Sequence, residues 1–85
     1  MRYRGWLVLQ TYLGSSRGGS VWMQKGMPDL CVIKGGRHVW LEVKTPSGRV
    51  SAAQAALHDD LRRHGAEVYV VRSIEDVMTA IKWQD

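Results

Sequence analysis

A Gly35-Gly36 pair separates two short apolar runs, residues 30–33 and 39–43, with Lys34 before it and Arg37 after it. A two-residue turn of type I′ needs positive φ at both central positions, and glycine adopts that conformation without steric cost. The sequence therefore predicts an antiparallel hairpin in which Lys34 faces Arg37. Both faces of the two runs are largely apolar, which is typical of strands that are covered on both sides.

This register brings charged side chains together at the open end of the hairpin. Counting back from the turn pairs Asp29 with Glu42, and directly opposed residues share a face with Cβ atoms about 4.5–5.5 Å apart. Lys44 follows Glu42 by two residues, so it points to the same face of the strand. The spacing therefore predicts that two carboxylates and one amine converge.

Two carboxylates at this distance repel each other unless a cation lies between them. Mg²⁺ prefers oxygen ligands and usually takes one or two carboxylates with waters and phosphate oxygens. We expect Asp29 and Glu42 to bind Mg²⁺, with the backbone carbonyl of Val43 as a further ligand, and Lys44 to orient a water or stabilise charge on phosphorus. Two simpler interpretations stay open: Asp29 is a turn residue after Pro28, or Glu42 and Lys44 form an exposed ion pair.

The other segments predict a mixture of helices and strands. A short helix is expected over about residues 4–13 and a strand over residues 20–24. Ser51-Ala52-Ala53-Gln54 resembles a capping box, which begins a helix that continues to His64. Residues 67–71 predict a strand parallel to residues 39–43, and a last helix extends to about Trp83. The expected fold class is α/β (α+β), a mixed sheet flanked by helices in the order α-β-β-β-α-β-α.

The length of 85 residues allows one domain, residues 1–85. A chain this short buries only about 60% of its unfolded surface, so a partner subunit would help to stabilise it. No apolar run approaches the ~20 residues of a membrane span, and the N-terminus has no leader pattern. We therefore expect an intracellular, cytoplasmic protein without membrane contact.

The single cysteine, Cys31, excludes an internal disulfide and has apolar neighbours that predict burial.

The charge balance favours a phosphate-bearing partner. The formal net charge is +4, the pI is about 9.6, and the first 28 residues contain no acid. A basic surface attracts nucleic acid by releasing counterions. The weak candidates for DNA contact are the basic residues of predicted loops and of one strand end: Arg17, Lys25, Lys34, Arg37, Arg49 and Arg72.

Pro28-Asp29 followed by Glu42-Val43-Lys44 resembles the PD-(D/E)XK nuclease signature. The segment 26–30 (Gly-Met-Pro-Asp-Leu), the helix with Gln54 and the strand end at residues 70–72 are similar to the VRR-NUC branch of that superfamily. The resemblance covers nearly the whole chain and implies a restriction-endonuclease-like core that uses Mg²⁺ or Mn²⁺ to hydrolyse DNA phosphodiesters. By match, Asp29 and Glu42 are metal ligands, Lys44 is the catalytic lysine and Gln54 is an accessory catalytic residue.

The small stand-alone members that this chain resembles are virus-encoded and look like homodimers that act on branched DNA such as Holliday junctions. Many members also hold the metal with an acid on the first helix. No acid precedes Asp29 here, and Gln10 is the polar side chain that could replace it.

Gln54 has two candidate roles, the capping box and the accessory catalytic role, and one amide is not expected to serve both partners fully. The three histidines, His38, His58 and His64, are expected at the surface rather than as metal ligands.

These observations predict a Mg²⁺-dependent, structure-selective DNA endonuclease. Three other functions stay open: a nuclease that acts on flaps or free ends, a catalytically weak or inactive DNA-binding module of the same fold, and a structural oligomer. The last would show no salt-sensitive affinity for DNA.

Overall fold

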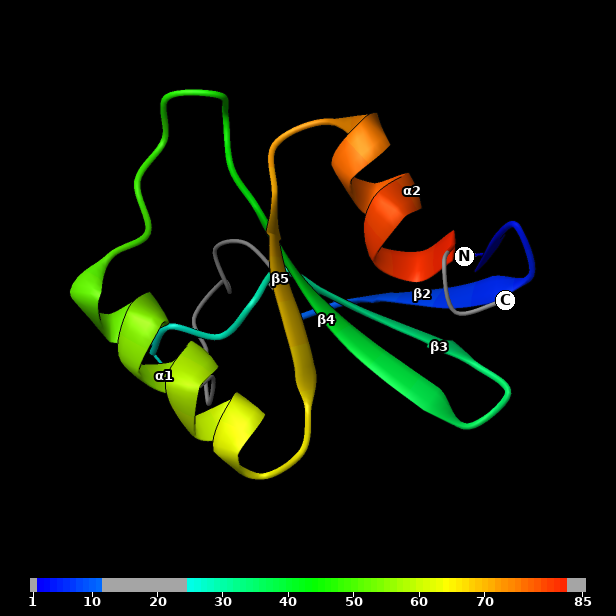
Figure 1. Ribbon diagram of the computed structural model, residues 1–85, viewed down its shortest axis with the longest axis horizontal. Coiled ribbons are helices and arrows are strands. Elements are labelled where there is room, and N and C mark those ends of the chain that lie inside the picture. The colour runs from blue at the N-terminus through cyan, green and yellow to red at the C-terminus, as the bar shows by residue number, and fades with distance from the viewer. Residues whose placement is uncertain (1, 12–24, 83–85) are drawn as a thin grey trace, which may run out of the picture.

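The computed structural model describes residues 2–11 and 25–82, which form a mixed five-stranded sheet with two helices (Figure 1). The strand order in the sheet follows the chain, β1-β2-β3-β4-β5. Only the β4–β5 pairing is parallel, and the other three are antiparallel. The elements are β1 (Arg2–Tyr3), β2 (Trp6–Gln10), β3 (Leu30–Lys34), β4 (Arg37–Val43), α1 (Ala52–Arg63), β5 (Glu67–Val71) and α2 (Ile74–Lys82).

The predicted hairpin and its register are confirmed. Gly35 and Gly36 have φ angles of 57° and 83°, as a type I′ turn requires. Lys34 faces Arg37, and the pairing continues without a bulge to Leu30 opposite Leu41. The β3–β4 hairpin therefore has the register that the glycine pair predicts.

The β4–α1–β5 unit also forms as expected. Ser51 is the N-cap of α1, and both hydrogen bonds of the capping box with Gln54 are present. The parallel pairing places Glu42 opposite Val70 and Val43 opposite Val71. The last helix, α2, is described as far as Lys82, so the predicted end at Trp83 lies outside the described residues.

The helix that the sequence predicts over residues 4–13 is wrong. The chain instead forms the β1–β2 hairpin, with Arg4 and Gly5 at positive φ in its turn, and β2 pairs with β3. The run from Trp6 to Leu9 is apolar at every position, so it satisfies helical and strand spacing equally. Pairing with β3 satisfies the backbone donors and acceptors along that strand, which decides the outcome.

The observed element order is accordingly β-β-β-β-α-β-α, while the mixed sheet flanked by helices is confirmed. The strand predicted over residues 20–24 lies outside the described residues. Within the described ranges, neither helix is long and apolar enough to cross a membrane.

The two helices cover opposite faces of the sheet (Figure 1). Strand residues alternate between faces, so Glu42 and Leu41 point in opposite directions. Glu42 contacts side chains of α1, whereas Leu41 packs in a core cluster with Ile81 of α2. The face under α1 contains the candidate active site, and the face under α2 contains the main apolar core.

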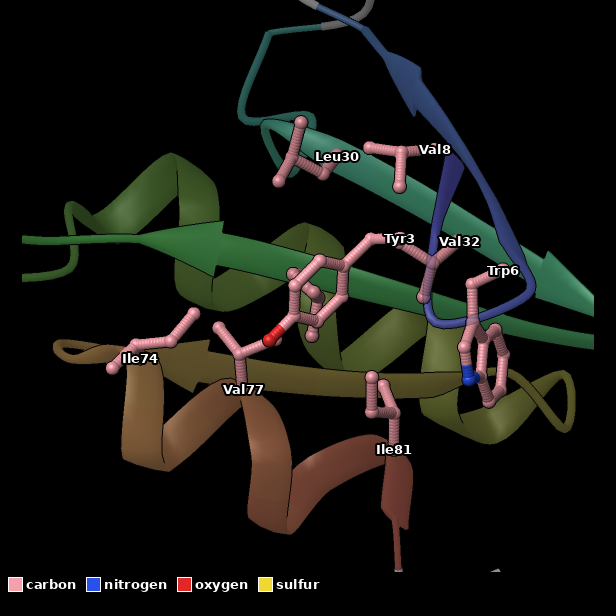
Figure 2. A pocket seen from close by; sticks show the side chains of 9 residues that line it. Tyr3, Trp6, Val8, Leu30, Val32, Ile74, Val77 and Ile81 are labelled. Carbon is pink, nitrogen blue, oxygen red and sulfur yellow. The ribbon is translucent and has the colours of Figure 1, made fainter. Parts of the chain in front are cut away.

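The core on the α2 face includes an apolar pocket of about 180 Å³. Figure 2 shows side chains of the strands, Tyr3 and Trp6 among them, pointing toward Ile74, Val77 and Ile81 of α2. Trp6 and Val32 are buried in this cluster. The apolar packing that anchors the sheet thus lies on the face away from Glu42.

A close contact fixes the turn before Asp29 against α1. Gly26 has a φ of 90°, and a Cβ built on it would lie 2.5 Å from the carbonyl oxygen of Ala53 and 3.1 Å from the backbone nitrogen of Gln54. Only glycine fits at this distance, so Gly26 permits the turn to approach the first turn of the helix.

Substitution of Gly26 is therefore expected to cost more than the backbone strain alone. Gly65 is the matched control, because it has the same φ of 90° but a Cβ there would meet nothing within 4 Å. We expect Gly65→Ala to lower the free energy of unfolding by about 1–2 kcal/mol, and Gly26→Ala to lower it further. Urea denaturation of both variants measures the difference, and equal losses would contradict the contact.

Candidate active site

Asp29, Glu42 and Lys44 converge at the end of the β3–β4 hairpin that is far from its turn. Asp29 comes directly before β3, Glu42 is in β4 and Lys44 follows β4. Oδ2 of Asp29 accepts a hydrogen bond from the backbone N–H of Val43 at 2.9 Å. Nζ of Lys44 lies 3.7 Å from Oε2 of Glu42. The hairpin register thus places the two carboxylates and the amine on the face that α1 covers.

The Glu42 carboxylate is almost completely buried, with a relative exposure of 1%. Oε2 accepts a hydrogen bond from Nε2 of Gln54 at 3.0 Å. Oε1 lies 3.5 Å from Nε2 of His58. A buried carboxylate is costly unless it is paired, so its surroundings determine its protonation state.

The pKa of Glu42 is raised from 4.5 to about 7, first because burial disfavours the charged form and second because the Asp29 carboxylate is close. The ammonium group of Lys44 acts in the opposite direction and limits the increase. A divalent cation between Asp29 and Glu42 would favour the ionised form of Glu42, because it supplies the missing positive charge.

The Gln54 amide serves both of its candidate partners at once. Its Oε1 accepts from the backbone N–H of Ser51 at 2.9 Å, which completes the capping box, and its Nε2 donates to Glu42. The expectation that one amide cannot serve both partners was wrong. The oxygen and the NH₂ group of an amide diverge, and Ser51 and Glu42 lie at the two ends of the side chain.

His58 is not at the surface, so its expected exposure was wrong. Its relative exposure is 2%, and its ring faces Glu42 from α1. His58 follows Gln54 by four residues, and residues at this spacing lie on the same face of a helix. Once Gln54 is placed against Glu42, this spacing is the signal that could have found His58. His38 and His64 are exposed, as expected.

The carbonyl of Val43 points toward the Asp29 side of β4. The backbone N–H of Lys44 donates to the carbonyl of Val71 in β5 at 2.9 Å, and the described residues contain no cis peptide bond. In a trans peptide the C=O of one residue and the N–H of the next point in opposite directions. The Val43 carbonyl therefore points away from β5, to the side where Asp29 lies.

The donor set fits a hard divalent cation such as Mg²⁺. It offers two carboxylates and one carbonyl, and waters and substrate oxygens complete such sites. Within residues 2–11 and 25–82, no group of three or more His, Cys, Asp or Glu side chains is placed to hold a metal ion. Oε1 of Glu42 is buried and lacks a hydrogen-bond partner among the described residues.

Gln10 does not replace the additional acid near Asp29. It is exposed on β2 opposite Leu30, and strand alternation places both on the face away from Glu42. Thr11, the residue after Gln10, lies next to the backbone of Asp29. Its backbone N–H donates to the carbonyl of Asp29 at 2.9 Å, and its hydroxyl donates to the carbonyl of Pro28. The end of β2 thus holds the backbone that carries the first carboxylate.

The basic candidates for DNA contact are divided between two ends of the hairpin. Lys25 is exposed in the turn before Asp29, and Arg49 is exposed between β4 and α1. Arg72 donates from Nη1 to the carbonyls of Thr45 and Gly48, so it holds the loop that follows Lys44. These three belong to the end where the site lies, and Arg17 lies outside the described residues.

Lys34 and Arg37 lie at the turn of the hairpin, away from the carboxylates. Arg37 donates to both carboxylate oxygens of Glu67 at 2.7 Å and to carbonyls in the last turn of α2. Its guanidinium also stacks over Trp6, 5.4 Å from the ring centroid. Arg37 thus fastens α2 to the sheet rather than lining the site.

The raised pKa of Glu42 predicts how the stability of the metal-free protein depends on pH. The folded state favours the protonated form of Glu42. Its contribution to the free energy of unfolding is therefore most favourable below pH 4.5, the pKa in the unfolded chain, and is lost as the pH rises through about 7, the pKa in the folded state. Relative to Glu42→Gln, which cannot ionise, the wild type is expected to lose about 2–3 kcal/mol of stability between pH 5 and 8.

Urea denaturation of both proteins in the presence of a chelator measures this loss. A stability difference that stays constant across that pH range would show that Glu42 is not held in a buried, acid-paired environment.

The profile of the VRR-NUC domain matches residues 22–75, a span that includes Asp29, Glu42, Lys44, Gln54 and His58. A comparison with curated proteins finds no match. The matched span exceeds half of the chain. The resemblance of the Pro-Asp and Glu-Val-Lys motifs is therefore confirmed, and the chain belongs to the VRR-NUC family of PD-(D/E)XK-type nuclease domains.

Proposed function

We propose that this protein is a Mg²⁺-dependent DNA endonuclease in which Asp29, Glu42 and the carbonyl of Val43 bind the metal ion and Lys44 acts on the reacting phosphate. The observation on which the proposal rests is the convergence of Asp29, Glu42 and Lys44 at one end of the hairpin, with Glu42 buried under Gln54. Nucleases of this type generally use a divalent metal ion, and Mn²⁺ is expected to substitute.

Each residue has a distinct task in this proposal. A bound Mg²⁺ lowers the pKa of a water and neutralises charge that develops on the phosphate. Asp29 is fixed by the Val43 N–H, so its second oxygen stays available. Gln54 holds Oε2 of Glu42 and restricts rotation of the carboxylate. The ammonium of Lys44, half-buried beside Glu42, orients the attacking water or stabilises the charge on phosphorus.

DNA is the expected substrate because the domain is a nuclease domain and the chain has a net charge of +4. The candidates for phosphate contact are Lys25 in the turn before Asp29, Arg49 in the loop between β4 and α1, and Arg72 directly after β5. Arg72 also holds the loop after β4, so its substitution is expected to alter that loop.

The preference for branched DNA is the finer part of the proposal. It rests on the resemblance to small stand-alone members of the family, as does a two-fold dimer that would place two sites for paired cuts. Flap- or end-directed cleavage and a catalytically inactive DNA-binding module are the alternatives. The inactive module stays an alternative because no acid precedes Asp29, which leaves the metal fewer charged ligands.

Cleavage assays on four DNA forms test the proposal. We expect the protein to cut a four-way junction faster than flap, single-stranded or linear duplex DNA with Mg²⁺ or Mn²⁺, and to cut none of them with a chelator. Glu42→Gln is expected to reduce cleavage by about 100-fold or more while DNA affinity is kept or increased, because a negative charge that faces the phosphates is removed. Glu75→Gln, exposed on α2, is the matched control and should leave cleavage unchanged.

The outcomes separate the alternatives. Faster cleavage of flaps or free ends would replace the junction preference and leave the metal site in place. If the wild type bound DNA but cut no form with either metal, the protein would be a binding module instead.

A further inference from the structure

Two buried polar atoms face each other across the interface between β4 and α1. Oε1 of Glu42 and Nε2 of His58 lie 3.5 Å apart, and their side chains have relative exposures of only 2% and 3%. Among the described residues, neither atom has a hydrogen-bond partner. Nearly all buried polar atoms in folded proteins have such a partner, so this pair needs an explanation.

The surroundings of His58 favour a neutral ring. Its side chain is buried between β4 and α1, where a charged imidazolium would lose its hydration. A neutral imidazole has one N–H donor and one acceptor nitrogen. With its N–H on Nε2, His58 can donate to an ionised Glu42 without bringing a second charge into the interior.

We propose that His58 is a positioning residue for metal binding, which donates from Nε2 to Oε1 of Glu42 and so orients this carboxylate toward the metal ion. This inference rests on the function proposed above. Gln54 and His58 are one helical turn apart on α1 and then hold one carboxylate oxygen each. An ionised carboxylate has about four lone-pair sites, so both hydrogen bonds leave lone pairs for the metal ion.

Two hydrogen-bond donors would fix the orientation of the Glu42 carboxylate more completely than one donor does. The hydrogen bond from Gln54 holds one carboxylate oxygen and restricts rotation about the Cγ–Cδ bond only in part. A second hydrogen bond to Oε1 would fix the plane of the carboxylate. Residues that orient metal ligands typically change metal affinity by about 10–100-fold when they are removed. His58 would therefore set the affinity for the metal without touching it.

Mn²⁺ binding without DNA tests this role directly. Isothermal titration calorimetry with Mn²⁺ would compare the wild type with His58→Met, which fills similar space but has no donor, and with His58→Gln, whose amide can reach the position of Nε2. We expect His58→Met to weaken Mn²⁺ binding by about 10-fold or more and His58→Gln to restore it to within about 3-fold. His38→Met is the matched control, because His38 is an exposed residue of the same strand as Glu42.

Restored Mn²⁺ affinity in His58→Gln would distinguish a positioning role of His58 from a role in packing alone. Circular dichroism and thermal melting would confirm that the variants fold. If His58→Met did not fold, His58→Asn would take its place, because its shorter amide is polar but cannot reach Glu42, and the same loss is expected. Equal Mn²⁺ affinity in the wild type and in the folded variant without the donor would overturn the inference, as would a loss that His58→Gln fails to restore. Absence of Mn²⁺ binding in the wild type would instead overturn the proposed function.

Discussion

The burial of one carboxylate, that of Glu42, is the constraint on which the site depends. An ionised acid inside a small domain is unfavourable unless other groups compensate for its lost hydration. Here α1 supplies the hydrogen bond from the amide of Gln54 to Oε2, the ring of His58 lies 3.5 Å from Oε1, and the amine of Lys44 lies 3.7 Å from Oε2. The remaining compensation, the positive charge that two neighbouring acids require, is what a divalent cation provides. The geometry of the proposed metal site therefore depends on how α1 packs against β4.

Local features of the sequence made much of this arrangement predictable. The Gly35-Gly36 turn sets the register of β3 against β4, and this register alone places Asp29, Glu42 and Lys44 on one face. The capping box at Ser51 sets where α1 begins and hence which of its residues reach Glu42. In contrast, the apolar residues of the first segment fill both strand and helix positions, so their spacing does not distinguish a strand from a helix. Its conformation is decided by β3, which lies 20 residues farther along the chain.

Contacts between distant segments explain what was missed in the site. His58 lies among exposed neighbours on α1, and its burial follows only from how that helix rests on β4. Arg37 and Lys34 are basic and flank a turn, which suggested phosphate contact, yet Arg37 is occupied by Glu67, 30 residues away. The double use of the Gln54 amide likewise depends on the position of Glu42 relative to the helix cap. Spacing identifies candidate residues, whereas tertiary packing decides which of them meet.

Anomalous diffraction at the manganese edge, from crystals grown with Mn²⁺, tests the central claim most directly. The account predicts one strong peak with oxygens of Asp29, Glu42 and Val43 each about 2 Å from it, and with Glu42 still bonded to Gln54. A peak elsewhere on the protein, or a Glu42 side chain turned away from Asp29 in the metal-bound crystal, would contradict it.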